Sequence, residues 1–92
     1  MKYLNLLELA EKVLNSTVHI LELHDTNNRV YTFIEIVNDR LYFTNEKTGQ
    51  SFSIYKDDTQ FKLDNKTALI EPFYILDTDI KIQSVHLSEH IA

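Results

Sequence analysis

The chain has 92 residues, a formal net charge of −5, no cysteine, one glycine and one proline. A single domain covering residues 1–92 is expected at this length, and such a domain buries roughly 65% of the surface that its unfolded chain exposes. Hydrophobic residues make up 43% and charged residues 25%, which predicts a folded rather than a disordered protein. The absence of cysteine excludes disulfides and thiolate metal sites.

The N-terminal segment is apolar enough to raise the question of a signal peptide. Glu8 and Glu11 interrupt that segment, and no small-residue cleavage site follows. No apolar run approaches the length of a membrane span. We therefore expect a cytoplasmic protein without a membrane partner.

One helix is predicted over residues 3–15. Its apolar side chains cover an arc of roughly 200°, which is wider than a surface helix needs to cover one sheet. Two explanations stay open: the helix is gripped on two sides by its own sheet, or part of it faces a second copy in a homodimer. The residues of the arc are Leu4, Leu6, Leu7, Leu9, Ala10, Val13 and Leu14.

From residue 17 onward the apolar pattern changes to the alternation of strands. The first four strands form an antiparallel meander, and the second of them, 30–37, is apolar on both faces, which predicts a strand covered on both sides. Two strands change phase, one between Ile20 and Leu21 and one at Gln83-Ser84, as bulged strands do. Asn and Asp are expected to supply most turns because glycine is scarce. The predicted strands are 17–24, 30–37, 40–45, 51–55, 60–63, 67–71, 73–76 and 79–87.

These elements predict an α+β fold: an N-terminal helix followed by a curled antiparallel sheet of five to seven short strands, closing toward a small SH3-like or Sm-like barrel. A helix followed by bent strands is also the element order of Sm-like RNA-binding proteins. The glycines on which the motifs of that family depend are missing here, so the similarity is one of element order and the chain is not assigned to the family.

The segment from His86 to His90 reads HLSEH and fits the H-x-x-E-H pattern of zinc peptidases. That motif must lie on a helix and needs a third ligand further along the chain, whereas two residues remain here and the preceding ones read as strand. We interpret it as a polar tail. A structural metal site that adds His19 or His24 is a weaker alternative, and no metal or cofactor is expected.

Two acid-x-Lys triplets, Asp64-Asn65-Lys66 and Asp79-Ile80-Lys81, match the core of metal-dependent nucleases. A nuclease needs a further carboxylate in the same pocket, and chance matches to so short a pattern are common. No nucleophile motif and no glycine-rich phosphate loop is present, so we expect no enzyme activity.

The negative charge is unevenly distributed. Residues 1–56 carry seven acids and six bases, a net charge of −1, whereas residues 57–92 carry seven acids and three bases, a net charge of −4. An acidic surface repels phosphate backbones, so direct nucleic-acid binding is not expected. Charge of this size also serves solubility in small domains. Its functional interpretation is contact with a basic surface on a partner protein.

We expect a small, acidic, non-enzymatic interaction protein. Its sharpest form is an inhibitor or antagonist that covers the basic, nucleic-acid-binding surface of a partner. Anti-CRISPR, anti-restriction and immunity proteins have this size and charge, which favours a phage or mobile element as the source. The residues expected to contact the partner are Asp57, Asp58, Asp64, Asp77 and Asp79, with Tyr42 and Tyr55 as anchors.

Two alternatives come from other functional classes. The first is an Sm-like or SH3-like nucleic-acid-binding module that stacks bases on Phe33, Tyr42, Phe43 and Phe52, residues that also suit a core. The second is a small metal-dependent hydrolase built on Asp79, Lys81 and the terminal histidines.

Overall fold

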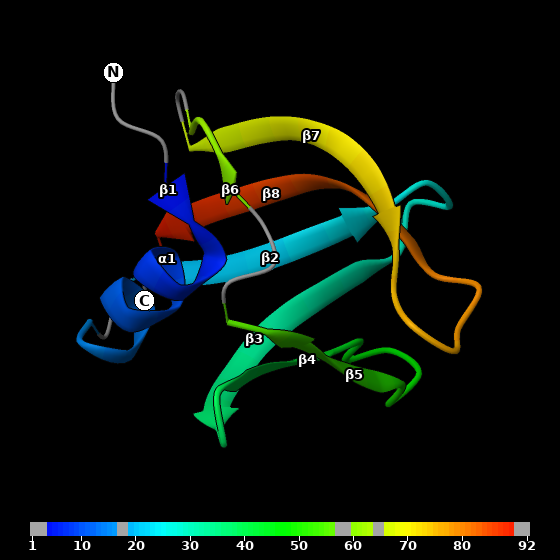
Figure 1. The fold of residues 1–92 in the computed structure, drawn as a ribbon, viewed down its shortest axis with the longest axis horizontal. Coiled ribbons are helices and arrows are strands. Elements are labelled where there is room, and N and C mark those ends of the chain that lie inside the picture. The colour runs from blue at the N-terminus through cyan, green and yellow to red at the C-terminus, as the bar shows by residue number, and fades with distance from the viewer. Residues whose placement is uncertain (1–3, 17–18, 57–59, 64–65, 90–92) are drawn as a thin grey trace.

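The computed structural model describes residues 4–16, 19–56, 60–63 and 66–89 (Figure 1). One helix and eight strands follow each other along this part of the chain. In order they are β1 (Leu4–Asn5), α1 (Leu6–Leu14), β2 (His19–Asp25), β3 (Val30–Val37), β4 (Arg40–Thr44), β5 (Ser51–Tyr55), β6 (Gln60–Phe61), β7 (Thr67–Tyr74) and β8 (Lys81–Glu89).

Helix α1 begins three residues later than expected because Leu4 and Asn5 are extended and pair with β6. Asn5 then caps the helix: its side-chain oxygen accepts a hydrogen bond from the backbone N–H of Glu8 at 2.9 Å. Asparagine is a favoured N-cap residue because it satisfies a backbone donor that lacks an intrahelical partner. The cap therefore sets the helix start at Leu6.

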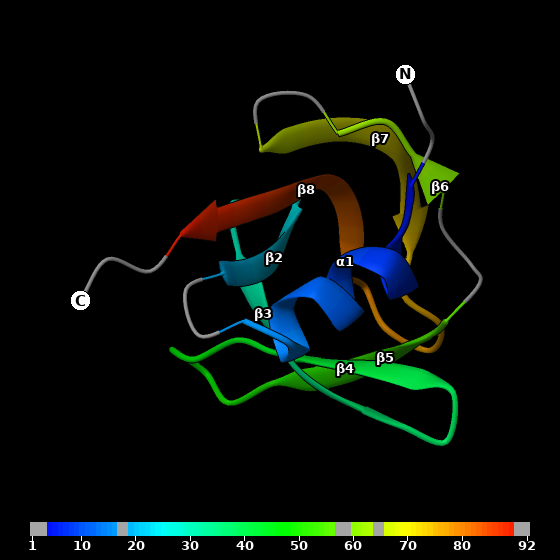
Figure 2. The same ribbon diagram turned by 90° about the vertical axis from the view of Figure 1, so that its left-hand side faces the viewer.

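Six antiparallel strands form one sheet in the order β5-β4-β3-β2-β8-β7. The predicted meander from β2 to β5 is confirmed, and β8 joins it on the other side of β2. The sheet is strongly curled into a half-barrel (Figure 1, Figure 2). The predicted α+β class with a curled, barrel-like sheet is therefore confirmed.

Helix α1 lies on the concave side of this half-barrel, where it contacts β2 and β3 (Figure 2). Leu6, Leu9 and Ala10 are buried, and other residues of the apolar arc pack partly against the core. Leu14, at the C-terminal end, is 53% exposed. Most of the wide arc is thus covered by the chain's own sheet, and a homodimer through this helix stays a prediction.

The phase change predicted in β8 is present. Asp25 pairs with Ile82 and the preceding His24 pairs with Ser84, so β8 has one extra residue, Gln83, at this point. Such a bulge turns the following side chains to the other face. As a result Ile82 and Val85 are both buried although they are three residues apart.

The phase change predicted in β2 is wrong. The pairing of β2 with β8 runs without interruption from His19 to His24. Leu21 and Leu23 therefore face the core, whereas Ile20 lies half-buried on the other face. Further irregularities lie in β3, between Phe33 and Glu35, and in β7.

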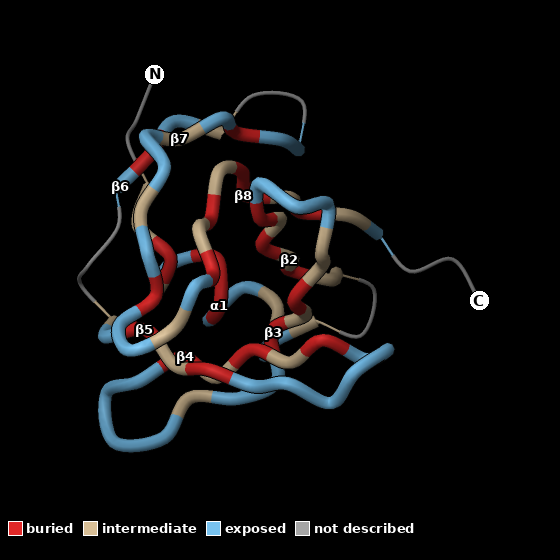
Figure 3. Tube along the Cα trace, turned by 90° about the vertical axis from the view of Figure 1, so that its right-hand side faces the viewer, coloured by how far each residue is buried: buried red, intermediate tan, exposed pale blue. Residues whose placement is uncertain are grey.

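The prediction that the strand 30–37, which is β3, is covered on both sides is also wrong. Tyr31 and Phe33 are buried, but Ile34 is 50% exposed and Val37 lies on the surface as well. No second layer covers the convex face of the sheet in the part of the chain that the structure describes, and buried residues alternate with half-buried or exposed ones along most strands (Figure 3). An apolar pattern on both faces does not by itself create such a layer.

In the last third of the chain the predicted strands 67–71 and 73–76 are one strand, β7, which runs through Pro72. A proline interrupts a strand in the middle of a sheet but is tolerated at an edge, where its missing N–H would face away from the neighbouring strand. Because β7 is the last strand in the sheet order, it continues past the proline.

Asn and Asp supply most of the left-handed turn positions, as expected. Among the described residues other than glycine, positive φ angles occur at Asn28, Asn38, Asp39, Lys66 and Asp77. Two consecutive left-handed residues, Asn38 and Asp39, join β3 to β4, which suits the right-handed twist of a two-residue hairpin. Gly49 has φ +77° in the turn between β4 and β5.

The turn between β2 and β3 is organised by Asp25, which is completely buried. Its carboxylate accepts hydrogen bonds from the backbone N–H groups of Asn27 (2.9 Å) and Arg29 (2.8 Å) and from Nε of Arg29 (2.6 Å). A buried carboxylate is stable when it is paired and hydrogen-bonded in this way. Asp25 therefore joins the hairpin to the core.

Replacing Asp25 by alanine is expected to lower the free energy of unfolding by about 3–5 kcal/mol, because it leaves the Arg29 charge and two backbone donors without their acceptor. Urea unfolding followed by circular dichroism measures this loss. The control is Thr26→Ala, an exposed neighbour, which should change the unfolding free energy by less than about 0.5 kcal/mol. A loss below about 1 kcal/mol for Asp25→Ala would contradict the role given to the carboxylate.

Candidate functional site: an open groove between two sheet edges

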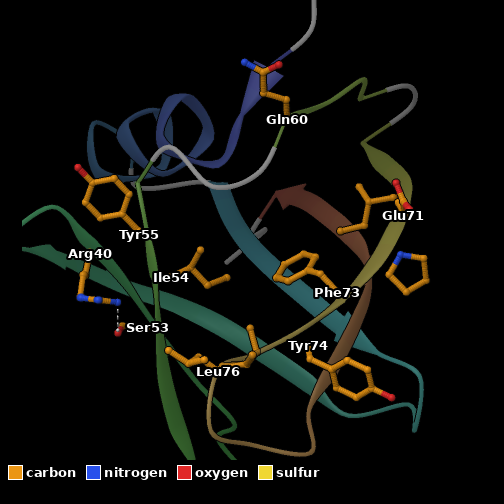
Figure 4. A pocket seen from close by; sticks show the side chains of 12 residues that line it. Arg40, Ser53, Ile54, Tyr55, Gln60, Glu71, Phe73, Tyr74 and Leu76 are labelled. Atoms are coloured by element: carbon orange, nitrogen blue, oxygen red, sulfur yellow. Dashed lines mark hydrogen bonds between the residues drawn. The ribbon is translucent and has the colours of Figure 1, made fainter.

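A groove with a volume of about 630 Å³ lies between β5 and β7 (Figure 4). Its size is in the range of ligand-binding clefts in proteins. Ile54 on β5 and Phe73 on β7 face each other across it (Figure 4). The other lining residues are Arg40 of β4, Ser53 and Tyr55 of β5, Gln60 of β6, and Ile70, Glu71, Pro72, Tyr74, Ile75 and Leu76 in and after β7.

The groove exists because the half-barrel is not closed. Strands β5 and β7 are the two ends of the sheet order, and within the described residues neither pairs with a strand on its outer side. The curl of the sheet brings these two ends to opposite sides of the groove (Figure 1, Figure 4). The groove is therefore bordered by two sheet edges.

The hydrogen bonds between β4 and β5 show which backbone groups of β5 face the groove side. The N–H of Lys56 donates to the carbonyl of Asp39 at 3.0 Å, so these two residues form a hydrogen-bonded pair. In an antiparallel ladder such pairs alternate along the strand. The next ones inward are therefore those of Ile54 and Phe52, which direct their backbone groups to β4.

Ser51, Ser53 and Tyr55 are the alternate residues, and their backbone N–H and C=O groups point to the free edge. No backbone hydrogen bond to these groups is found in the described part of the chain. Edge strands are usually protected by charged residues, proline, bulges or a covering segment. The five residues of β5, SFSIY, contain no charge, proline or glycine.

The other border of the groove differs. Strand β7 carries Pro72, which has no N–H, and its register with β8 shifts between Leu69 and Phe73. Both features disturb a regular row of donors and acceptors. The groove thus has an edge able to form regular hydrogen bonds on the β5 side and a wall of side chains on the β7 side.

Large apolar side chains surround the groove on its exposed side. Tyr55 is 42% exposed, Tyr74 66% and Leu76 85%. The ammonium group of Lys81 lies 5.3 Å from the centre of the Tyr74 ring. Apolar surface gathered around a cleft is typical of interaction sites, whereas single exposed apolar residues are common everywhere.

The charged groups around the groove have little pairing of their own. Arg40 lies on the β5 side, where its Nη1 is 3.5 Å from the Ser53 hydroxyl, and Glu71 lies on the β7 side (Figure 4). Asp77 and Asp79 are exposed in the turn that follows Leu76. No ion pair involves these four residues within the described chain. Arg40, Glu71 and Asp77 are therefore free to contact a partner, whereas Asp79 also acts electrostatically on Arg29 in the turn between β2 and β3.

The residues predicted to contact a partner are only partly gathered here. Tyr55 lines the groove, and Asp77 and Asp79 follow its β7 wall in the chain. Tyr42 is half-buried on β4, on the same face as Arg40. Asp57, Asp58 and Asp64 lie outside the described residues.

Sequence reasoning missed the groove itself. Ile54 lies in the predicted strand 51–55 and Phe73 in the separate predicted strand 73–76, and nothing in the sequence indicates that they face each other. Two local signals were available: Pro72 inside an apolar run marks an edge strand, and β5 lacks the charges that usually protect an edge.

A second cluster lies across β2 and β8. The rings of His24 and His86 stack with their centres 3.6 Å apart. Nε2 of His86 lies 2.9 Å from the Ser84 hydroxyl, and Nε2 of His24 lies 3.7 Å from Oε1 of Glu22. Burial lowers the pKa of His86, the neighbouring His24 lowers it further, and Glu22 raises it.

The histidine cluster does not support the predicted metal sites, which are the zinc-peptidase motif and the structural site that adds His19 or His24. Among the described residues, no three His, Asp or Glu side chains are placed so that they could hold a metal ion. His86 lies in a strand, not on the helix that the peptidase motif requires, and His19 is hydrogen-bonded to Ser16 at 2.8 Å. His90 lies outside the described residues.

The described residues of the two acid-x-Lys triplets do not form a metal site either. Asp79 is exposed, Ile80 between it and Lys81 is completely buried, and Lys81 lies against the Tyr74 ring. The other triplet contains Asp64, which lies outside the described residues.

The aromatic residues proposed as a base-stacking surface are mostly in the core. Phe33, Phe43 and Phe52 are buried, and the ring centre of Phe43 lies 5.7 Å from that of Phe33 and 5.6 Å from that of Phe52. Tyr42 remains partly accessible. A flat exposed platform of these four rings is not present.

We expect the amide protons of Ser53 and Tyr55 to exchange with solvent at least roughly ten-fold faster than those of Phe52 and Ile54, because only the latter bond to β4. Amide hydrogen exchange followed by NMR measures the four rates. The internal control is the segment Glu22–His24 of β2, since β3 and β8 bond this segment on both sides and no alternation is expected there. Uniform protection along β5 would show that another segment covers this edge.

The histidine cluster predicts a pH dependence of stability. The folded-state pKa of His86 lies below its ordinary value of 6.5, so the folded protein is more stable when His86 is neutral. This stabilisation is fully present above pH 6.5 and is lost as the pH falls through the lowered pKa. Urea unfolding between pH 7.5 and 5 should therefore show a larger loss of stability for the natural chain than for His86→Gln. Parallel curves for the two proteins would contradict this assignment.

The described part of the chain holds no helix that is both long enough and apolar enough to cross a bilayer. Comparison with known proteins finds no matching family model, curated protein or solved structure. The geometry of the groove and the charge around it carry the proposal that follows.

Proposed function

We propose that this chain is a non-enzymatic binding protein that attaches to a partner protein with a basic surface, as an inhibitor or antagonist of that surface. The observation that carries the proposal is the open groove between β5 and β7, with accessible apolar side chains and unpaired acidic residues beside it. Clefts with an apolar floor and a few polar groups are where proteins bind their ligands.

Charge supports the choice of a basic partner. The chain has a net charge of −5, of which residues 57–92 contribute −4. Asp77 and Asp79 are exposed at the end of the β7 wall, and Glu71 lies in the groove. Complementary charge speeds the encounter of two proteins and disfavours partners of the same sign.

The apolar side chains around the groove would supply binding energy in addition to the charge attraction. Tyr is enriched among the residues that dominate binding energy, because its ring buries much surface and its hydroxyl keeps a hydrogen bond. Tyr55 and Tyr74 lie on opposite sides of the groove (Figure 4). They are the anchors that this proposal assigns, and Tyr42 on the neighbouring strand is a third.

The two alternative classes have less support. A nucleic-acid-binding module would need stacking surfaces, and three of its four proposed aromatic residues are buried. A metal-dependent hydrolase would need converging ligands, and the described residues provide no such group. Neither class has a specific observation in its favour.

The partner is sought by affinity capture from a lysate of the source cell, with and without nuclease and at low and high salt. We expect a stoichiometric protein partner that withstands nuclease and is lost at high salt, because exposed charges are screened by salt. Capture that disappears with nuclease would mean that nucleic acid is the ligand.

The charge prediction is tested with the double variant Asp77→Asn, Asp79→Asn, in which asparagine tolerates the left-handed backbone at position 77. At low salt we expect it to slow association with the captured partner by roughly three- to ten-fold, and at high salt by much less. The matched control, Glu35→Gln with Glu46→Gln, removes the same charge from exposed positions away from the groove. Equal effects of the two double variants would show that only total charge matters.

A further inference from the structure

We propose that the groove binds one extended segment of the partner protein as an added β-strand, which pairs with the free edge of β5 and fills the gap between β5 and β7. This inference rests on the proposed function and specifies how the partner is held. Main-chain hydrogen bonds to the edge would give affinity, and side chains of the segment that enter the groove would give selectivity.

The backbone of β5 is suited to receive such a strand. Ser51, Ser53 and Tyr55 direct their N–H and C=O groups outward in the regular alternation of an antiparallel strand. An uncharged, regular edge is a template for pairing with another chain. β7 is the poorer template because Pro72 and the register shift interrupt its row of donors.

An added strand would direct one face into the groove and the other face to the convex side of the sheet. Successive side chains of a strand point to opposite faces, so every second residue of the segment would enter the space between Ile54 and Phe73. The residues between them would lie on the convex side, near Tyr55 and Arg40. We therefore infer apolar residues at alternate positions of the segment.

The acidic residues on the β7 side of the groove indicate that the segment carries a basic residue. Glu71 in the groove and Asp77 after it place carboxylates on the β7 side, and no described residue neutralises them within ion-pair distance. A lysine or arginine beside the apolar positions of the segment would pair with them. The occupant is thus an extended, alternating apolar segment with a basic residue next to it.

A second copy of this chain fits the groove less well. Strand β5 of a copy is already bonded to its own β4, so it would bring a second strand with it, and β7 borders the opposite side of the groove. Two copies also carry −5 each and repel one another. A single segment of a basic partner avoids both difficulties.

The first test uses a random twelve-residue peptide library displayed on phage and selected against the immobilised chain. We expect the enriched peptides to alternate apolar and polar residues and to contain lysine or arginine. Synthetic copies of these peptides are then titrated against the natural chain and against Ser53→Pro. Absence of enrichment, or enriched peptides without alternation, would overturn the proposal.

Proline at position 53 blocks the edge with little effect on the sheet, because the N–H of Ser53 points away from β4. We expect it to weaken the enriched peptides by at least about ten-fold, a change of about 1.4 kcal/mol in binding free energy. The matched control, Ser53→Ala, removes the same hydroxyl and its contact with Arg40 but keeps the backbone donor, so it should bind within about two-fold of the natural chain. Equal binding by the natural chain and Ser53→Pro would overturn the assignment to β5.

A second measurement does not depend on how Ser53→Pro folds. The best peptide is made with N-methyl groups on alternate amides, in the two possible registers. An added strand bonds to β5 through one set of amides, so one register should lose at least about ten-fold in affinity and the other should lose little. Equal affinities for the two methylated peptides would overturn strand addition.

The captured partner separates this inference from the proposed function. If Ser53→Pro still binds it normally while Asp77→Asn with Asp79→Asn weakens binding, strand addition is wrong and the acidic binding protein stands. If no protein partner is captured, the proposed function fails independently of the peptide results.

Discussion

The extra residue in β8 is the constraint that places Ile82 and Val85 in the same core, and register shifts in β3 and β7 bend the sheet further. One extra residue, Gln83, lies opposite the step from His24 to Asp25 in β2. Bulges of this kind increase the local twist and turn the side chains that follow. Ile82 and Val85 both reach the concave side as a result. The sheet therefore wraps around α1 instead of lying flat beneath it, and both the core and the groove follow from that shape (Figure 2).

Wrapping without closure leaves two edges on opposite sides of one groove, and these edges are chemically different. In β7, Pro72 and the shifted register break the row of backbone donors. In β5, Ser53 and its alternate neighbours keep a regular row, and no charged residue guards it. Natural sheets usually protect both edges against pairing with other chains. The two sides of the groove therefore differ in what they can bind. The β5 side can form a ladder of backbone hydrogen bonds, and the β7 side provides side-chain contacts.

The sequence predicts features that depend on neighbouring residues and fails for features that depend on distant ones. The strand 51–55, the asparagine and aspartate turns, and the phase change at Gln83 depend on neighbouring residues, and the structure confirms them. The exposure of Ile34 could not be predicted, because the same apolar pattern suits a strand covered on both sides and the missing outer layer is a property of the whole fold. The groove could not be predicted for the same reason, because the placement of Ile54 opposite Phe73 depends on the order of all six strands.

Net charge and the open edge of β5 are physically connected. An unprotected, uncharged edge invites pairing between copies of the same chain. The chain carries −5, so two copies repel each other over distances comparable with the screening length, roughly 8–10 Å at ordinary ionic strength. The same charge would attract the basic partner proposed above. Acidic residues such as Glu71 and Asp77 would therefore act twice, by favouring a basic segment in the groove and by opposing self-association at an edge whose own residues provide no protection.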